Sequence, residues 1–126
     1  MYSSSSICEL WKTQLEFNKK LFKSKYGLDF CNLTNEQKNV YSKEFFNHLM
    51  VEVVEAMQEI PFKMHKVQQK VVDEAKLLEE FIDVFKFLLG WVQLRGFTCE
   101  QFTETFFSKS EKVEKIFNNE GGENNE

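Results

Sequence analysis

The sequence predicts an all-α protein whose helices pack as an antiparallel four-helix bundle. Apolar residues recur at helical spacing along four segments, start and stop signals separate these segments, and only one proline occurs in 126 residues. Hydrophobic residues make up 42% of the chain and charged residues 29%, which is typical of a globular domain. A chain of this length is long enough for one core, so we expect a single domain over residues 1–119.

The first two predicted helices have clear boundaries. Residues 6–9 and 34–37 both have the pattern of a capping box, in which Ser or Thr is followed three residues later by Glu or Gln. Gly27 is a suitable stop for the first helix, because glycine readily adopts the left-handed conformation that ends helices. Pro61 cannot continue the second helix, which we expect to end at about Ile60.

The third and fourth predicted helices follow a short basic segment. Asp73 is a suitable N-cap for the third helix, which should stop at Gly96. A further capping-box pattern at residues 98–101 opens the fourth helix. After Asn119 the sequence EGGENNE has no apolar residue, so we expect residues 120–126 to form a disordered acidic tail.

The third helix is apolar almost all round over its second half, which predicts burial on several sides. Glu80 and Asp83 fall among these apolar positions, and burying an unpaired carboxylate costs several kcal/mol. Lys76 is suitably spaced to pair with Glu80 in an ordinary ion pair. We nevertheless favour a functional role for Glu80 and Asp83, because buried carboxylates usually have a metal ion or a charged partner.

A second acidic pair, Glu52 and Glu55, lies on the second helix. Taken alone, this pair is typical of a solvated acidic stripe. Together with the first pair it would place four carboxylates from two helices around one cation, and all-oxygen ligands suit Mg²⁺ or Mn²⁺. Neither His48 nor His65 follows a Glu by three residues, which argues against a di-iron centre of the ferritin type.

Composition excludes several classes of function. The net charge of −4 disfavours sequence-independent binding of nucleic acid polymers, which requires excess Lys and Arg. The most apolar run, residues 81–92, is too short and too charged to span a membrane. The three cysteines are far apart and odd in number, which argues against a zinc site or a disulfide framework. Since no secretory signal is recognisable, we expect a reducing, cytoplasmic location.

The spacing of the acids resembles that of a known family. ExxE at residues 52–55 and ExxD at residues 80–83, in a small helical chain, are similar to the motifs of all-α nucleoside triphosphate pyrophosphohydrolases. These include MazG-like enzymes and dimeric dUTPases. Residues 14–18 resemble the Gln-x-x-Leu-Asn motif of the dimeric dUTPases, and residues 61–66 their Trp-Lys-x-Trp-Lys segment. Lys86 stands where their second acidic helix has His.

The resemblance covers about residues 10–117 and weakens towards the C-terminus. Lys109 matches the lysine of the C-terminal signature of the dimeric dUTPases. Ser110, Val113 and Ile116 stand where that signature has Asn, Asn and Arg. The acidic motifs therefore account for most of the resemblance.

The resemblance implies Mg²⁺-dependent hydrolysis of a (deoxy)nucleoside triphosphate, dUTP or a related dNTP, to the monophosphate and pyrophosphate. The implied catalytic and metal-binding residues are Glu52, Glu55, Glu80 and Asp83. The implied substrate contacts are Gln14 and Asn18 to the base, Phe62 packing against it, and Lys63, Lys66 and Lys109 offsetting phosphate charge. Members of the family form dimers or tetramers, so we expect a homo-oligomer.

The alternative is a non-catalytic helical interaction module of the same fold, in which the acids form surface ion pairs. Such a module would neither bind nucleotides nor be stabilised by Mg²⁺. The altered C-terminal signature favours this alternative, whereas the expected burial of Glu80 and Asp83 favours the enzyme. The sequence leaves open the base, the sugar and the carboxylate that activates water.

Overall fold

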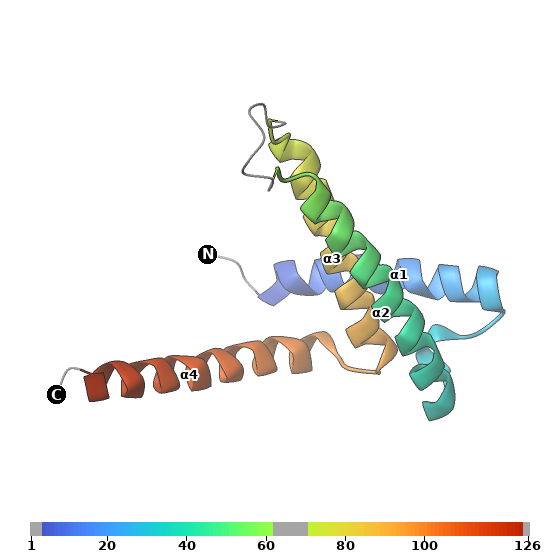
Figure 1. Cartoon of the computed structure of the whole chain (residues 1–126). Helices are drawn as coiled ribbons and strands as arrows, with labels where there is room; N and C mark the ends of the chain where they lie inside the picture. Colours follow the sequence, from blue (N-terminus) through green and yellow to red (C-terminus); the bar gives the residue numbers. More distant parts are fainter. Residues whose placement is uncertain (1–3, 62–70, 125–126) are drawn as a thin grey trace.

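The computed structural model describes the backbone of residues 4–61 and 71–124 (Figure 1). Its elements are α1 (Ser4–Tyr26), a short 3-10 helix η1 (Phe30–Asn32), α2 (Asn35–Gln58), α3 (Glu74–Leu94) and α4 (Cys99–Asn124). The described residues contain no strand. The predicted all-α architecture with four α-helices is therefore confirmed.

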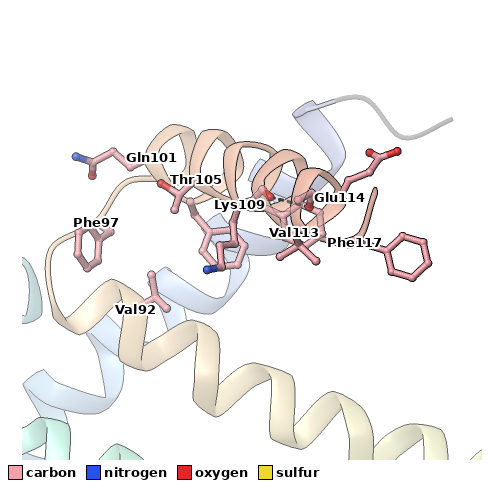
Figure 2. A pocket seen from close by; sticks show the side chains of 11 residues that line it. Val92, Phe97, Gln101, Thr105, Lys109, Val113, Glu114 and Phe117 are labelled. Atoms are coloured by element: carbon pink, nitrogen blue, oxygen red, sulfur yellow. Dashed lines mark hydrogen bonds between the residues drawn. The ribbon is translucent and has the colours of Figure 1, made fainter. Parts of the chain in front are cut away.

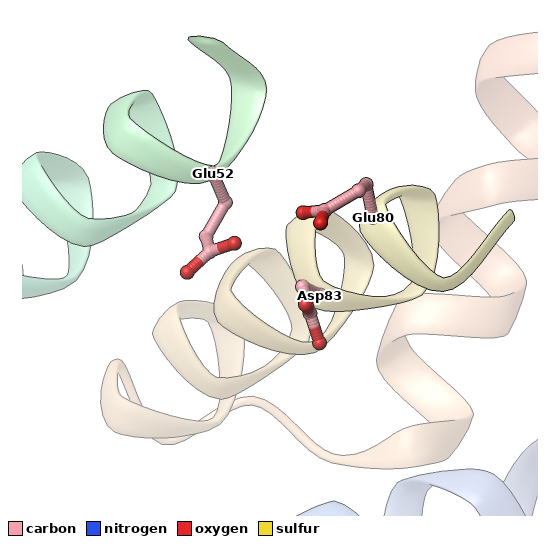
Figure 3. Close-up of side chains that lie close together, drawn as sticks. All are labelled: Glu52, Glu80 and Asp83. Carbon is pink, nitrogen blue, oxygen red and sulfur yellow. The ribbon is translucent and has the colours of Figure 1, made fainter. Parts of the chain in front are cut away.

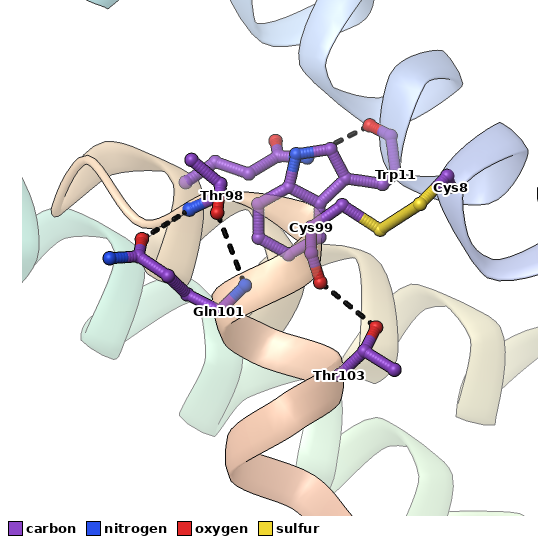
Figure 4. The surroundings of a disulfide bond; sticks show 7 residues. Cys8, Trp11, Thr98, Cys99, Gln101 and Thr103 are labelled. Atoms are coloured by element: carbon purple, nitrogen blue, oxygen red, sulfur yellow. Dashed lines mark hydrogen bonds between the residues drawn. A yellow bond between two sulfur atoms is a disulfide. The ribbon is translucent and has the colours of Figure 1, made fainter. Parts of the chain in front are cut away.

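The predicted N-caps of α2, α3 and α4 are present. In α2 the Thr34 hydroxyl accepts from the Gln37 backbone N–H at 3.1 Å, while the Gln37 side chain accepts from the Thr34 N–H at 2.9 Å. Thr98 and Gln101 form the same reciprocal pair at the start of α4 (Figure 4). The Asp73 carboxylate caps α3 by accepting from the Lys76 N–H at 3.2 Å. These bonds satisfy backbone donors that have no partner within the helix.

The first residue of α1 and the last residue of α4 differ from the predicted boundaries. Helix α1 begins at Ser4, so the expected capping box at residues 6–9 lies inside the helix. The sequence has four successive serines at residues 3–6, all of a type that caps helices well, and spacing alone did not distinguish among them. Helix α4 continues to Asn124, past the expected domain boundary at residue 119, and the disordered acidic tail stays a prediction. Extending an existing helix requires no new nucleus, so a polar end can remain helical.

Helices α2 and α3 pack side by side along much of their length as an antiparallel pair, and α1 crosses this pair (Figure 1). The core between the three helices consists of Phe22, Phe30, Leu33, Phe45 and Leu94. Gly90 of α3 permits α1 and α2 to pack closely against α3. A Cβ atom at Gly90 would lie 2.8 Å from the Phe45 ring and 2.9 Å from the Asn18 side-chain nitrogen, closer than real Cβ contacts.

Helix α4 is attached at its first turn and then extends away from the other helices (Figure 1). Cys99 packs with Trp11 and Leu89 in a second small core, and it forms a disulfide with Cys8 of α1 (Figure 4). This corrects the expectation that the chain lacks disulfides. Cysteine spacing along the sequence did not reveal that two helices bring these residues together, with Cα atoms 5.9 Å apart.

Helix α3 is less enclosed than its composition predicts. Phe85 is 39% exposed and Leu88 42% exposed, so the expectation that the second half of this helix is buried on several sides is wrong for the single chain. A similar row of exposed apolar side chains follows α4: Phe106, Phe107, Val113, Ile116 and Phe117. No helix in the described residues has the length and apolar content needed to cross a membrane.

Candidate functional site

Three acidic side chains from the facing helices α2 and α3 come together (Figure 3). Glu52 of α2 points towards Glu80 of α3, and Asp83 lies about one turn further along α3. Each of the three supplies one carboxylate oxygen, and these oxygens all lie within 4.8 Å of one another. The antiparallel packing of α2 and α3 therefore brings residues from both predicted acidic motifs into one cluster, called here the acidic cluster.

The acidic cluster leaves two carboxylate oxygens without a partner. Oε2 of Glu52 and Oε2 of Glu80 are buried, and neither accepts a hydrogen bond from any residue in the described part of the chain. Burial, followed by the negative charge of Glu55, raises the pKa of Glu52 above its usual value. Burial, followed by the charges of Glu55 and Asp83, also raises the pKa of Glu80. The cluster therefore lacks positive charge.

A hard divalent cation fits this donor set. All available ligands are carboxylate oxygens, two of them are buried without a hydrogen bond, and one oxygen of each side chain lies within 4.8 Å of the others. Mg²⁺ and Mn²⁺ prefer a few carboxylates with water in the remaining positions. Glu55 is exposed and lies outside the three-residue cluster, although its charge reaches both Glu52 and Glu80.

The burial of the acids differs from the sequence-based expectation. We expected Glu80 and Asp83 to be buried together, whereas Glu52 and Glu55, taken alone, were typical of a solvated stripe. Instead, Glu52 and Glu80 are partly buried, whereas Glu55 and Asp83 are exposed. The reason is that one acid of each motif faces the opposite helix. A helical wheel shows the angular position of a residue but not the direction from which the neighbouring helix approaches.

The lysine considered as a partner for Glu80 binds elsewhere. The Lys76 ammonium lies 3.2 Å from Oε1 of Glu59, which is buried near the end of α2. The hydrogen bond with Glu59 raises the pKa of Lys76, and the charge of Lys76 only partly offsets the rise in the pKa of Glu80. The expected alternative of a Lys76–Glu80 ion pair is therefore not the contact that forms.

A hollow of about 390 Å³ adjoins the acidic cluster and is called here the amide hollow. Gln14 and Asn18 of α1 line it and are both buried, and Asp83 belongs to the lining as well as to the acidic cluster. The structure thus brings together three residues that the sequence separates by up to 69 positions (83 − 14). A ligand in the hollow would contact α1 and α3 at once.

Further residues of the amide hollow were missed or set aside at the sequence level. Lys25 and Lys86 supply positive charge to its lining, and the ring of His48 stacks on Phe87 with centroids 5.3 Å apart. The Tyr26 hydroxyl donates a hydrogen bond to a Glu44 carboxylate oxygen at 2.7 Å. Burial, followed by this hydrogen bond, raises the pKa of Tyr26 to about 12. The sequence signal for Lys86 was its position on the helix of the second acidic motif, where the dimeric dUTPases have His.

Gln93 is the most informative residue that sequence reasoning missed. It is 5% exposed and lies on the buried face of α3, where its side chain bonds to Asn18 and to the Trp11 backbone carbonyl. The available signal was a neutral amide among apolar residues near the end of the helix. An uncharged polar residue on an apolar face usually has a specific hydrogen-bond partner.

Of the other predicted substrate-binding residues, the structure describes Lys109, and it does not bring this residue to the acidic cluster. Lys109 lies on α4 and lines a separate hollow of about 770 Å³ with Phe97 and Val113 (Figure 2). That hollow shares no lining residue with the amide hollow. Phe62, Lys63 and Lys66 lie outside the described residues, so their roles stay predictions.

Comparison with known proteins identifies one family. The model of a family described as dUTPase matches residues 6–121, which is nearly the whole chain. No curated protein and no solved structure matched the chain. The matched range includes both acidic motifs, both amides of the hollow and Gln93.

Proposed function

This chain belongs to the all-α dUTPase family, and we propose that it is a Mg²⁺-dependent nucleoside triphosphate pyrophosphohydrolase. The proposed substrate is dUTP or a related deoxynucleoside triphosphate, and the products are the monophosphate and pyrophosphate. One observation carries this proposal: the acidic cluster, with its two unpartnered oxygens, shares Asp83 with the amide hollow. The proposed metal ligands and the proposed base pocket therefore have one residue in common.

Glu52, Glu80 and Asp83 would hold the metal, with Glu55 beside them. When bound, Mg²⁺ would neutralise charge on the phosphate oxygens and polarise the reacting phosphoryl group. Gln14 and Asn18 would contact the base, while Lys25 and Lys86 would offset phosphate charge at the rim of the hollow. Water would attack the α-phosphorus and lose its proton to one of the carboxylates, as the bond to the β-phosphate breaks and pyrophosphate leaves.

A panel of nucleotides tests the proposed activity. We expect the purified protein with Mg²⁺ to release pyrophosphate and a nucleoside monophosphate from dUTP or a related dNTP, and addition of EDTA to stop the release. Products should be separated by anion-exchange chromatography, because release of inorganic phosphate would indicate cleavage at a different bond. If no dNTP or NTP yields pyrophosphate, and Mg²⁺ does not raise the melting temperature, the chain is instead the non-catalytic interaction module.

We also propose that the protein is a homo-oligomer, a dimer or a tetramer. Exposed apolar side chains form rows along both α3 and α4, and monomeric proteins rarely expose apolar patches of this extent. A second copy would bury them. In an oligomer, Lys109 would reach a metal centre only by contributing to the site of another chain, since within its own chain it lines a separate hollow.

Sedimentation equilibrium tests the oligomer. The unmodified protein should sediment as a dimer or tetramer, and Phe81→Asp or Phe117→Asp should shift it towards the monomer, because each places a charge in an exposed apolar row. Lys112→Asp is the matched control, since it introduces the same side chain at a position of α4 that is already polar and exposed. A monomer at every concentration of the unmodified protein would contradict this proposal.

A further inference from the structure

Four polar groups form a continuous chain of hydrogen bonds beneath the amide hollow. The Gln93 side-chain nitrogen donates to the Trp11 backbone carbonyl at 2.9 Å. The Gln93 side-chain oxygen accepts from Nδ2 of Asn18 at 3.1 Å, and Oδ1 of Asn18 accepts from Nε2 of Gln14 at 3.3 Å. The three amide side chains are all buried, with exposures of 2% to 6%. We call this chain of bonds the amide relay.

The direction of the amide relay follows from its first member. A backbone carbonyl can only accept, so the side chain of Gln93 must turn its NH₂ group towards Trp11 and its oxygen towards Asn18. An oxygen facing Asn18 requires the NH₂ group of Asn18 in return, which leaves the Asn18 oxygen for Gln14. The orientation of each amide is thereby determined by the one before it.

The amide relay ends at an acceptor without a partner. Oε1 of Gln14 is buried and receives no hydrogen bond from any of the residues that the structure describes. A buried acceptor without a hydrogen bond destabilises the folded state. Gln14 lines the amide hollow, so a ligand there could satisfy this oxygen with an N–H group.

We propose that Gln93 is a positioning residue for ligand recognition: it fixes the orientation of Asn18 and Gln14, and so presents an acceptor to a nucleobase edge that carries an N–H donor. Gln93 does not line the hollow and acts only through the two amides. This inference rests on the proposed function, because it requires a nucleotide in the amide hollow.

The packing around Asn18 supports the proposal. Gly90 lies one turn before Gln93 on α3, and a methyl group there would lie 2.9 Å from the Asn18 side-chain nitrogen. The missing side chain leaves room for the Asn18 amide at this point. The Asn18 amide therefore packs directly against α3, where its nitrogen donates to the Gln93 side-chain oxygen.

Binding of nucleoside monophosphates tests this role without requiring catalysis. Calorimetry should measure the dissociation constants of dUMP, dTMP, dCMP, dAMP and dGMP for the unmodified protein, Gln93→Met and Gln93→Glu. Gln93→Met preserves the size of the side chain but removes both hydrogen bonds, so Asn18 can rotate. We expect it to weaken binding of the preferred monophosphate about tenfold, which corresponds to about 1.4 kcal/mol, and to reduce the preference among bases.

Gln93→Glu separates positioning from stability. A carboxylate still accepts from the Asn18 nitrogen, so the orientation of Asn18 and the order of base preference should persist, although loss of the bond to Trp11 should lower the melting temperature. A merely structural role would lower stability in both variants and leave base preference unchanged in both. Gln58→Met is the control for the substitution itself, since Gln58 is exposed and does not line the hollow.

The outcomes distinguish this inference from the proposed function. If the unmodified protein binds monophosphates but releases no pyrophosphate from any triphosphate, the proposed function fails and the positioning role can still be measured. If Gln93→Met binds every monophosphate as tightly and in the same order as the unmodified protein, the positioning role is refuted. It is equally refuted if the unmodified protein binds none of them, because the Gln14 oxygen would then have no ligand.

Discussion

Glu80→Gln is expected to lower the rate of pyrophosphate release by at least about 100-fold, because it removes one of the three carboxylates proposed to hold the metal. The same change is expected to raise the melting temperature of the metal-free protein. Burial raises the pKa of Glu80, so its ionised form is less favourable in the folded state than in the unfolded chain. Glutamine has nearly the same shape without the charge.

The pH dependence of the metal-free protein follows from the same shift. A carboxyl group with a raised pKa binds its proton more tightly when folded, so stability is highest below the ordinary pKa and falls as the pH rises through the raised value. Glu52 shifts in the same direction and should add to this trend. We therefore expect Mg²⁺ to stabilise the unmodified protein most at neutral pH, and Glu80→Gln to lose most of this stabilisation.

Differential scanning calorimetry with and without Mg²⁺, together with the pyrophosphate assay, checks these expectations. Glu79→Gln is the matched control, because Glu79 is exposed, adjacent in sequence and outside the acidic cluster. It should retain both activity and Mg²⁺-dependent stabilisation. Full activity in Glu80→Gln would exclude the acidic cluster as the catalytic metal site, whatever its effect on stability.

Reduction of the Cys8–Cys99 disulfide is expected to lower the free energy of unfolding by about 4 kcal/mol, because the bond closes a loop with a sequence separation of 91 residues. Closing so long a loop strongly restricts the unfolded chain. The melting temperature should fall by roughly 10–20 °C. Each disulfide reduced by dithiothreitol gives two thiols and one oxidised dithiothreitol, so the change can be followed by thiol titration.

Variants separate the disulfide from other effects of the reductant. Cys8→Ser and Cys99→Ser should each melt at about the temperature of the reduced protein, and dithiothreitol should not lower it further. Cys31→Ser should behave like the unmodified protein, since Cys31 is exposed and outside the disulfide. Equal melting temperatures for the oxidised and reduced forms of the unmodified protein would show that the bond contributes no stability.

The sequence was most informative where the signals are local. The capping residues Thr34, Asp73 and Thr98 and the stop at Gly96 predicted helix boundaries, because caps depend on hydrogen bonds and backbone angles within a few residues. The acidic motifs could also be recognised in the sequence, since a spacing of three residues places both carboxylates on one side of a helix. The all-α fold and the family therefore followed from short-range patterns.

Features that depend on how two helices meet were not predictable in this way. Glu52 is more buried than Asp83, the reverse of the order that the sequence suggested. Their burial depends on the direction from which the facing helix approaches. The contact between Cys8 and Cys99 depends on where α4 meets α1. Gln93 was overlooked because its partners lie on another helix, far away in the sequence.

The junction of α1 and α4 also has a consequence for the order of folding. Helices α2 and α3 are neighbours in sequence, so their antiparallel pairing closes only a short segment of chain, whereas the junction joins Cys8 and Cys99, which are 91 residues apart. Loop-closure entropy rises with segment length, by about 0.6 kcal/mol for each doubling. We expect α2 and α3 to pair early and the junction to form late, so the acidic cluster would assemble before α4 is attached to α1.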